Sequence, residues 1–90
     1  MSKKYRKRPV EIEAVQFTYN SLDEVNEFID ENYYGGIEQS PDKPPHLIIE
    51  TDEGNHHAIE GDWIIKGVNN EFYPCKSDVF HQTYERVEDN

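Results

Sequence analysis

The residues of this chain that could carry chemistry are four histidines, one cysteine and several paired carboxylates. His56 and His57 are adjacent, and two neighbouring residues of a strand point to opposite faces of a sheet. One ion therefore cannot bind both rings without ligands from elsewhere, and the other donors lie at no spacing typical of a metal site. Those other donors are His46, His81 and Cys75. We predict exposed strand histidines and no metal site.

Cys75 and His81 could act as a nucleophile and its general base, because they flank a strand-to-helix junction. No third residue is placed to orient His81, and no oxyanion-forming motif accompanies the pair. The acidic pairs Asp23-Glu24 and Asp52-Glu53 match neither a calcium loop nor a Gly-rich phosphate loop. We therefore predict no catalytic residue, no cofactor and a non-enzymatic role.

Aromatic side chains are concentrated between Trp63 and Tyr84, where they could line a pocket for a flat ligand or fill the core. Phe72 and Tyr73 alternate along a strand, so one of them lies outside the main core. Pro74 cannot donate to a neighbouring strand, so its strand is an edge or is bulged. An outward Tyr73 at that edge is a candidate contact for a partner. The expected core contains Phe28, Ile29, Trp63, Ile65 and Phe80.

The charge of the chain is strongly acidic and unevenly distributed. The net formal charge is −10, although residues 1–8 carry five of the nine basic residues. From Pro9 onward, 19 acidic residues face four basic ones, a balance of −15. Such a body disfavours nucleic acid and anionic membranes and favours basic partners. The most concentrated acidic face belongs to a predicted helix and carries Asp23, Glu27, Asp30 and Glu31.

Three explanations of this charge distribution remain open. The acidic surface can simply keep a small protein in solution, with the basic arm lying against it. It can instead imitate nucleic acid and so bind a protein that normally binds DNA or RNA. The basic arm can also grip nucleic acid by itself, although the acidic body would repel the phosphates.

The order of predicted elements is a strand, a helix, a meander of four strands and a short helix. Ser21 and Glu24 fit a capping box at the start of a helix over about 21–34, whose apolar residues are spaced by three and four. Residues 36–45 hold three prolines and no periodicity, which predicts an exposed loop. Asn69-Asn70 suits a tight hairpin turn. The expected strands cover 10–18, 46–51, 56–60, 62–66 and 71–75, and the second helix covers about 78–85.

These elements predict an α+β fold, with a bent antiparallel sheet of about five strands and the main helix packed on one face. We expect one domain over residues 9–90, preceded by a flexible basic arm over residues 1–8. One cysteine cannot form an internal disulfide, which fits a reducing cytoplasm. No apolar run approaches the roughly 18 residues of a membrane span, so we expect a cytoplasmic protein with no membrane partner.

The chain resembles a family of small phage and prophage proteins in two segments. They are KKYRKRPVEIEAVQFT at residues 3–18 and GDWIIKGVNNEFYPCKSDVFHQTYE at residues 61–85, and together they cover roughly half of the chain. The resemblance implies a phage-derived gene in a bacterial host cell. It implies no reaction.

These observations predict a non-enzymatic phage or prophage accessory protein that binds a host or phage macromolecule through an acidic surface. The expected partner is a protein with a basic surface, direct binding of nucleic acid is not expected, and the chain is a monomer or a homodimer. The alternative is a protein that binds or sequesters a nucleotide-like ligand in an aromatic pocket around Trp63 and Tyr73. The candidate partner-binding residues are Asp23, Glu27, Asp30, Glu31 and Tyr73.

Overall fold

The computed structural model describes residues 2–6 and 8–87, which form six strands and two helices. The elements follow one another in the order β1 (Glu13–Gln16), α1 (Leu22–Phe28), β2 (Tyr34–Ser40), β3 (Lys43–Thr51), β4 (Gly54–Ala58), β5 (Trp63–Lys66), β6 (Phe72–Cys75) and α2 (Ser77–Thr83). The predicted α+β class is confirmed. Neither of these helices is long and apolar enough to cross a lipid bilayer.

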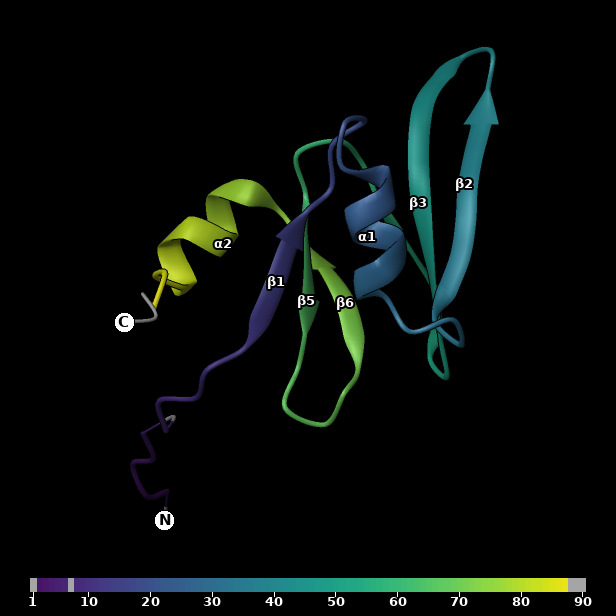
Figure 1. Cartoon of the computed structure of the whole chain (residues 1–90). Helices are drawn as coiled ribbons and strands as arrows, with labels where there is room; N and C mark the ends of the chain where they lie inside the picture. The colour runs from purple at the N-terminus through teal and green to yellow at the C-terminus, as the bar shows by residue number, and fades with distance from the viewer. Residues whose placement is uncertain (1, 7, 88–90) are drawn as a thin grey trace.

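The six described strands form two three-stranded antiparallel sheets, so the prediction of a single five-stranded sheet was wrong. One sheet has the order β1-β5-β6 and the other has the order β2-β3-β4 (Figure 1). The chain changes sheet between β4 and β5 at a tight turn. Gly61 has a φ of +99° there, and the buried carboxylate of Asp62 accepts a hydrogen bond from the N–H of Ile59 at 3.0 Å. This turn ends the meander after β4, because it directs β5 toward β1 instead.

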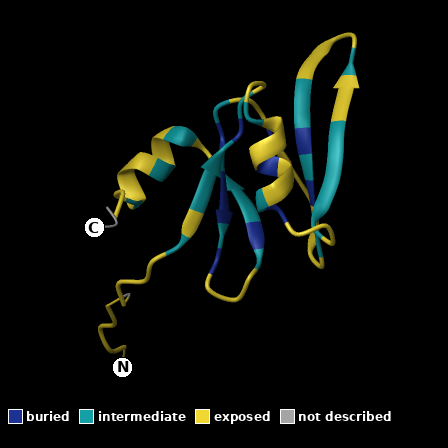
Figure 2. Cartoon of the chain, viewed as in Figure 1, coloured by how far each residue is buried: buried dark blue, intermediate teal, exposed yellow. Residues whose placement is uncertain are grey.

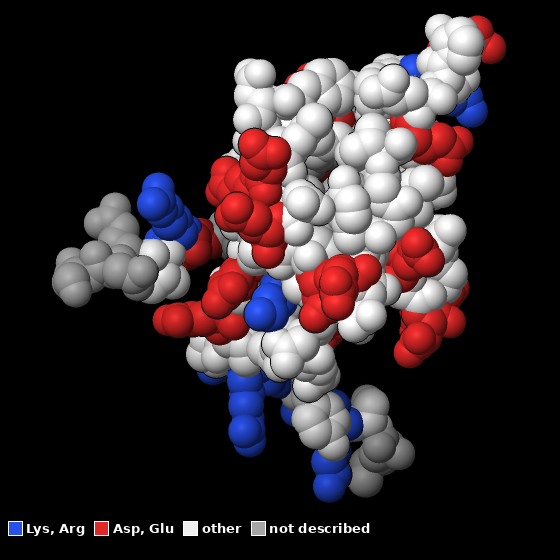
Figure 3. All heavy atoms as spheres, turned by 45° about the vertical axis from the view of Figure 1, so that its right-hand side comes forward, with Lys and Arg blue, Asp and Glu red and all other residues white. Residues whose placement is uncertain are grey.

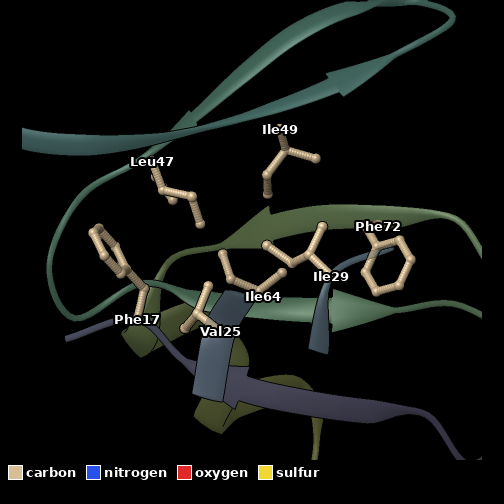
Figure 4. Packing of buried hydrophobic residues seen from close by; sticks show 8 residues of the cluster. Phe17, Val25, Ile29, Leu47, Ile49, Ile64 and Phe72 are labelled. Carbon is tan, nitrogen blue, oxygen red and sulfur yellow. The ribbon is translucent and has the colours of Figure 1, made fainter. Parts of the chain in front are cut away.

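The main core lies between the two sheets and beside α1 (Figure 4). Leu47 and Ile49 point from β3 toward Ile64 of β5, and all three are fully buried. Val25 and Ile29 close the core from the side of α1. Figure 2 shows buried residues on β3, β5 and β6 and on one side of α1. The other buried members of the cluster are Phe17, Ala58 and Phe72.

On the second face of the β1-β5-β6 sheet, α2 contacts Trp63. Trp63 is half-buried there, and its indole stacks on Phe80 of α2 with ring centroids 4.3 Å apart and planes 5° apart. Ile65 is buried on the same face and lies outside the main cluster. The predicted core therefore divides in two. Ile29 belongs to the main core with Phe28 packed against it. Trp63 and Ile65 lie on the second face of the sheet, where Phe80 of α2 stacks on Trp63.

Helix α1 is shorter than predicted and ends at Phe28 instead of near residue 34. Ile29 is extended, with φ −81° and ψ 127°. The carboxylate of Asp30 then accepts a hydrogen bond from the N–H of Asn32 at 2.9 Å. Because a short acidic side chain bonded to the backbone two residues on forms a turn, it competes with further helix.

The predicted capping box at the start of α1 is also absent. Ser21 occupies the cap position, but its side chain bonds to no N–H of the helix. The hydroxyl instead accepts a hydrogen bond from the N–H of Thr18 at 2.9 Å and lies 2.9 Å from the carbonyl of Gln16. Ser21 therefore fixes the turn between β1 and α1.

Residues 36–45, predicted to be an exposed loop, belong largely to the hairpin of β2 and β3. Pro41-Asp42 forms its two-residue turn. Pro44 and Pro45 lie in β3 before its pairing with β4 begins at Leu47, and the register against β2 shifts opposite them. Their missing N–H groups therefore interrupt no regular ladder, which explains how prolines fit this strand.

The predicted basic arm covers residues 1–8, of which 1 and 7 lie outside the described residues. Residues 2–6 and 8–12 contain no helix or strand, so β1 starts later than the expected residue 10. The flexibility of the arm stays a prediction. Residues 88–90 of the predicted domain also lie outside the described part of the chain.

Candidate functional site

Four of the predicted partner-binding residues lie together on and directly after helix α1. Asp23 and Glu27 are about one turn apart on the helix, and Asp30 and Glu31 follow its end. All four are exposed, because the helix buries Val25 and turns its charged side outward. Figure 3 shows acidic side chains in several groups over the face of the molecule that it presents. We call Asp23, Glu27, Asp30 and Glu31 the acidic helix face.

Few basic side chains neutralise this face. Among residues 2–6 and 8–87, Lys76 forms an ion pair with Asp62, and the ring of His46 lies 3.6 Å from the carboxylate of Glu38. Neither pair includes a member of the acidic helix face, and the last turn of α1 contains no basic residue. Apart from the hydrogen bond that Asp30 accepts from the N–H of Asn32, the carboxylates of this face are therefore left to interact with solvent or with a partner.

A shallow depression of about 410 Å³ adjoins the acidic helix face. Its lining brings Glu27 and Asp30 together with the rings of Phe28 and Phe72, and Lys66 lines it as well. An aromatic surface beside carboxylates suits the aliphatic stem and cationic head of a lysine or arginine side chain. Among the described residues, Lys66 is the one basic group of this lining, and it opposes a second cation.

Tyr73, the fifth predicted partner-binding residue, lies away from the acidic helix face. Phe72 packs edge-on against Phe28 of α1, with ring centroids 5.6 Å apart, so the next residue of β6 projects from the opposite face of the sheet. Burial, a hydrogen bond with Tyr84 and nearby negative charge raise the pKa of Tyr73 to about 12. β6 is an edge strand of its sheet, as Pro74 predicted. The structure therefore gathers the four carboxylates and separates Tyr73 from them.

The aromatic cluster around Trp63 is filled by the protein's own side chains. Phe80 covers one face of the indole, and Phe80 in turn contacts Tyr84 at a centroid distance of 5.2 Å. His81 meets the indole edge-on at 5.7 Å. A flat ligand would have to displace Phe80 and the helix that carries it, so this geometry does not favour the nucleotide-like pocket.

Cys75 and His81 are not arranged as a nucleophile and its base. The ring of His81 packs against Trp63, while the Cys75 thiol lies 3.6 Å from the carbonyl of Lys76. Burial, with smaller contributions from nearby carboxylates, raises the pKa of the Cys75 thiol. Since the thiolate is the reactive form, this environment disfavours nucleophilic chemistry.

The sequence did not predict a cluster of ligand-type side chains on the β2-β3-β4 sheet. Glu38 of β2, His46 of β3 and His57 of β4 place one ligand atom each within 4.8 Å of one another. Glu38 lies directly opposite His46, and both share the face that points away from the core. The opposite orientations of His56 and His57 follow the predicted strand pattern. The missing signal was the pairing of β2 with β3, because residues 36–45 were expected to be a loop.

No protein-family model, curated protein or solved structure matches this chain. The resemblance to phage and prophage proteins stays a prediction, and the function is argued from the geometry of the chain itself.

Proposed function

We propose that this chain is a non-enzymatic binding protein that recognises a basic surface of another protein through its acidic helix face. The observation that supports this is the exposure of four neighbouring carboxylates with no ion-pair partner among residues 2–6 and 8–87. Asp23 and Glu27 lie roughly 6 Å apart along α1 at 1.5 Å per residue, and Asp30 and Glu31 follow the end of the helix. The spacing along the helix is shorter than the Debye length of about 10 Å at 0.1 M salt, so these charges act on a partner together. In the setting that the resemblance implies, the partner is a host or phage protein.

The class of partner follows from the sign of the charge and from the depression. Nucleic acid carries phosphates that a chain with a net charge of −10 repels. A basic protein offers lysine and arginine side chains, whose stems can lie on Phe28 while their charges meet Glu27 and Asp30. Such a partner can make both apolar contacts and charge–charge contacts with this surface, whereas a small inorganic cation can make only charge–charge contacts.

The test compares variants of equal charge change at two places. Asp30→Asn with Glu31→Gln removes two charges from the acidic helix face, and the Asn side chain keeps an oxygen for the turn to Asn32. Asp52→Asn with Glu53→Gln removes two charges from the turn between β3 and β4 and is the matched control. The probes are a lysine- and arginine-rich peptide and a partner captured from a bacterial lysate, both measured by calorimetry at 0.1 M and 1 M salt.

The expected result is that the first variant weakens binding by roughly 2- to 30-fold, since exposed charge pairs contribute about 0.2–1 kcal/mol each. The control variant should change binding much less. Binding by the unmodified protein should weaken steeply with salt, because the screening length falls from about 10 Å to about 3 Å. Equal effects of the two variants would show that only the net charge matters, and the acidic helix face would not be the binding site.

Lys66 offers an independent measurement of the same surface. It lines the depression with Glu27 and Asp30, and it is half-buried. Replacing it with Gln removes a charge that opposes a basic partner, so Lys66→Gln should strengthen binding. Weaker binding after this change would mean that the depression is not occupied by a cationic side chain.

A further inference from the structure

We propose that Glu38, His46 and His57 form a binding site for Zn²⁺ that links the three strands of the β2-β3-β4 sheet. Each strand supplies one ligand: Glu38 comes from β2, His46 from β3 and His57 from β4. The three side chains stand on the face of the sheet that does not contribute to the main core. The site is separate from the acidic helix face, so it does not depend on the proposed binding function.

The strand register explains why these residues meet. Glu38 is the cross-strand neighbour of His46, and His57 is paired with Ile48, which lies two residues along β3 from His46. Side chains on one face of a sheet interact both directly across and along the diagonal. The rings of His46 and His57 accordingly have centroids 4.8 Å apart, with planes inclined by 48°.

The distances are close to those of a coordinated metal. Zn–N and Zn–O bonds of about 2.0–2.2 Å place tetrahedral ligand atoms about 3.3 Å apart. The Nε2 atom of His46 lies 3.6 Å from the Oε2 atom of Glu38, and all three ligand atoms lie within 4.8 Å. Closing around an ion therefore shortens the distances between the ligand atoms by up to about 1.5 Å, which rotation of the side chains provides without moving the strands.

Burial divides the three ligands into an anchor and two adjustable partners. The side chain of His46 is only 15% exposed, whereas that of Glu38 is 54% exposed. His57 is exposed as well. Because His46 is mostly buried, it would fix the position of the ion. The other two side chains extend into solvent and can move toward the ion.

The donor set selects the kind of metal. Two imidazoles and one carboxylate suit Zn²⁺ and related borderline cations, whereas Mg²⁺ and Ca²⁺ prefer sets made of oxygen atoms. Three protein ligands leave one tetrahedral position open. In a small chain that contains a single cysteine, an ion joining three strands would replace the cross-link that a disulfide provides elsewhere.

The experiment is a Zn²⁺ titration of the tagless protein by calorimetry, with thermal unfolding followed in parallel. We expect a single site and a rise in melting temperature with Zn²⁺ that a chelator reverses. His57→Ala should lower the affinity by at least about 10-fold, a loss that even outer-shell changes at metal sites can cause. His56→Ala is the matched control, because it changes the adjacent histidine on the opposite face of β4 and should leave the affinity unchanged.

Glu38→Gln is the second variant, since it keeps the size of an exposed side chain and removes the ligand charge. It should also weaken Zn²⁺ binding while the far-ultraviolet circular dichroism stays the same. Equal affinity in His57→Ala and His56→Ala would overturn the proposal. So would the absence of a calorimetric signal and of any melting shift at millimolar Zn²⁺.

Discussion

Replacing Phe80 with Ala tests how helix α2 is held to the rest of the protein. The helix has seven residues and none of them is buried. Helices this short are not stable by themselves in water, so α2 depends on its contacts with the β1-β5-β6 sheet. Its most extensive aromatic contact is the stack of Phe80 on Trp63, at 4.3 Å. We expect Phe80→Ala to release α2 while both sheets stay folded.

The size of the effect follows from the partial burial of the ring. Truncating a fully buried Phe costs about 3–5 kcal/mol, and Phe80 is half-buried, so we expect a loss of about 2 kcal/mol. A domain of this length has a free energy of unfolding of roughly 5–13 kcal/mol, so the variant remains folded. The direct aromatic pair accounts for about 0.5–1.5 kcal/mol, which a double-mutant cycle with Trp63→Leu isolates.

Tryptophan fluorescence provides the assay, because Trp63 is the only tryptophan in the chain. Loss of the stacked ring should shift its emission to the red, and urea unfolding should give the change in free energy. Val79→Ala is the control on the same helix, since Val79 is 47% exposed and its truncation should cost less than about 0.5 kcal/mol. An unchanged spectrum and unchanged stability in Phe80→Ala would refute the view that this stack holds α2.

Three shorter predictions concern the strands and turns. Gly35→Ala should destabilise the protein by about 1–3 kcal/mol in urea unfolding, because the new Cβ would meet Cγ2 of Ile48 at 2.7 Å. Asn70 has a φ of +62°, so Asn70→Ala should cost about 1 kcal/mol and Asn70→Gly should be tolerated, as thermal melting will show. The pKa of Tyr73 is raised from 10.0 to about 12, so its neutral form stabilises the fold below pH 10 and this contribution is lost between pH 10 and 12. An alkaline NMR titration of Tyr73 should show the high pKa, and Tyr84→Phe should lower it.

The sequence was sufficient for elements whose signals are local. The turn at Asn69-Asn70 was predicted from residue type, and Asn70 does adopt a positive φ. The strand pairing across it follows, with Lys66 opposite Phe72. Pro74 predicted a strand that is either an edge or bulged, because a residue without an N–H cannot serve two neighbouring strands, and β6 lies at the edge of its sheet.

The sequence was insufficient where the structure depends on contacts between distant segments. Prolines made residues 36–45 resemble a loop. The prolines within β3, however, lie before the point at which this strand begins to pair with β4, so β4 requires no N–H group from them. The split into two sheets depends on the turn at Asp62, whose burial no periodicity reveals. Helical spacing could place Asp23 and Glu27 on one side of α1, whereas the meeting of Glu38 with His46 requires the register of two strands. The separation of Tyr73 from that face likewise depends on which side of the sheet α1 covers.

The pairing of β1 with β5 sets the order in which the chain can fold. Glu13 meets Lys66 only after all the intervening residues have been made, whereas β2, β3 and β4 are joined by short turns. The entropy of loop closure therefore favours the meander first and the β1-β5-β6 sheet later. At a synthesis rate of roughly 5–20 residues per second, the core residue Phe17 is made about 2–10 s before β5 is complete. Charged residues that flank an apolar segment oppose its aggregation, so we expect the carboxylates that follow Phe17 in sequence to protect the unfinished chain during those seconds.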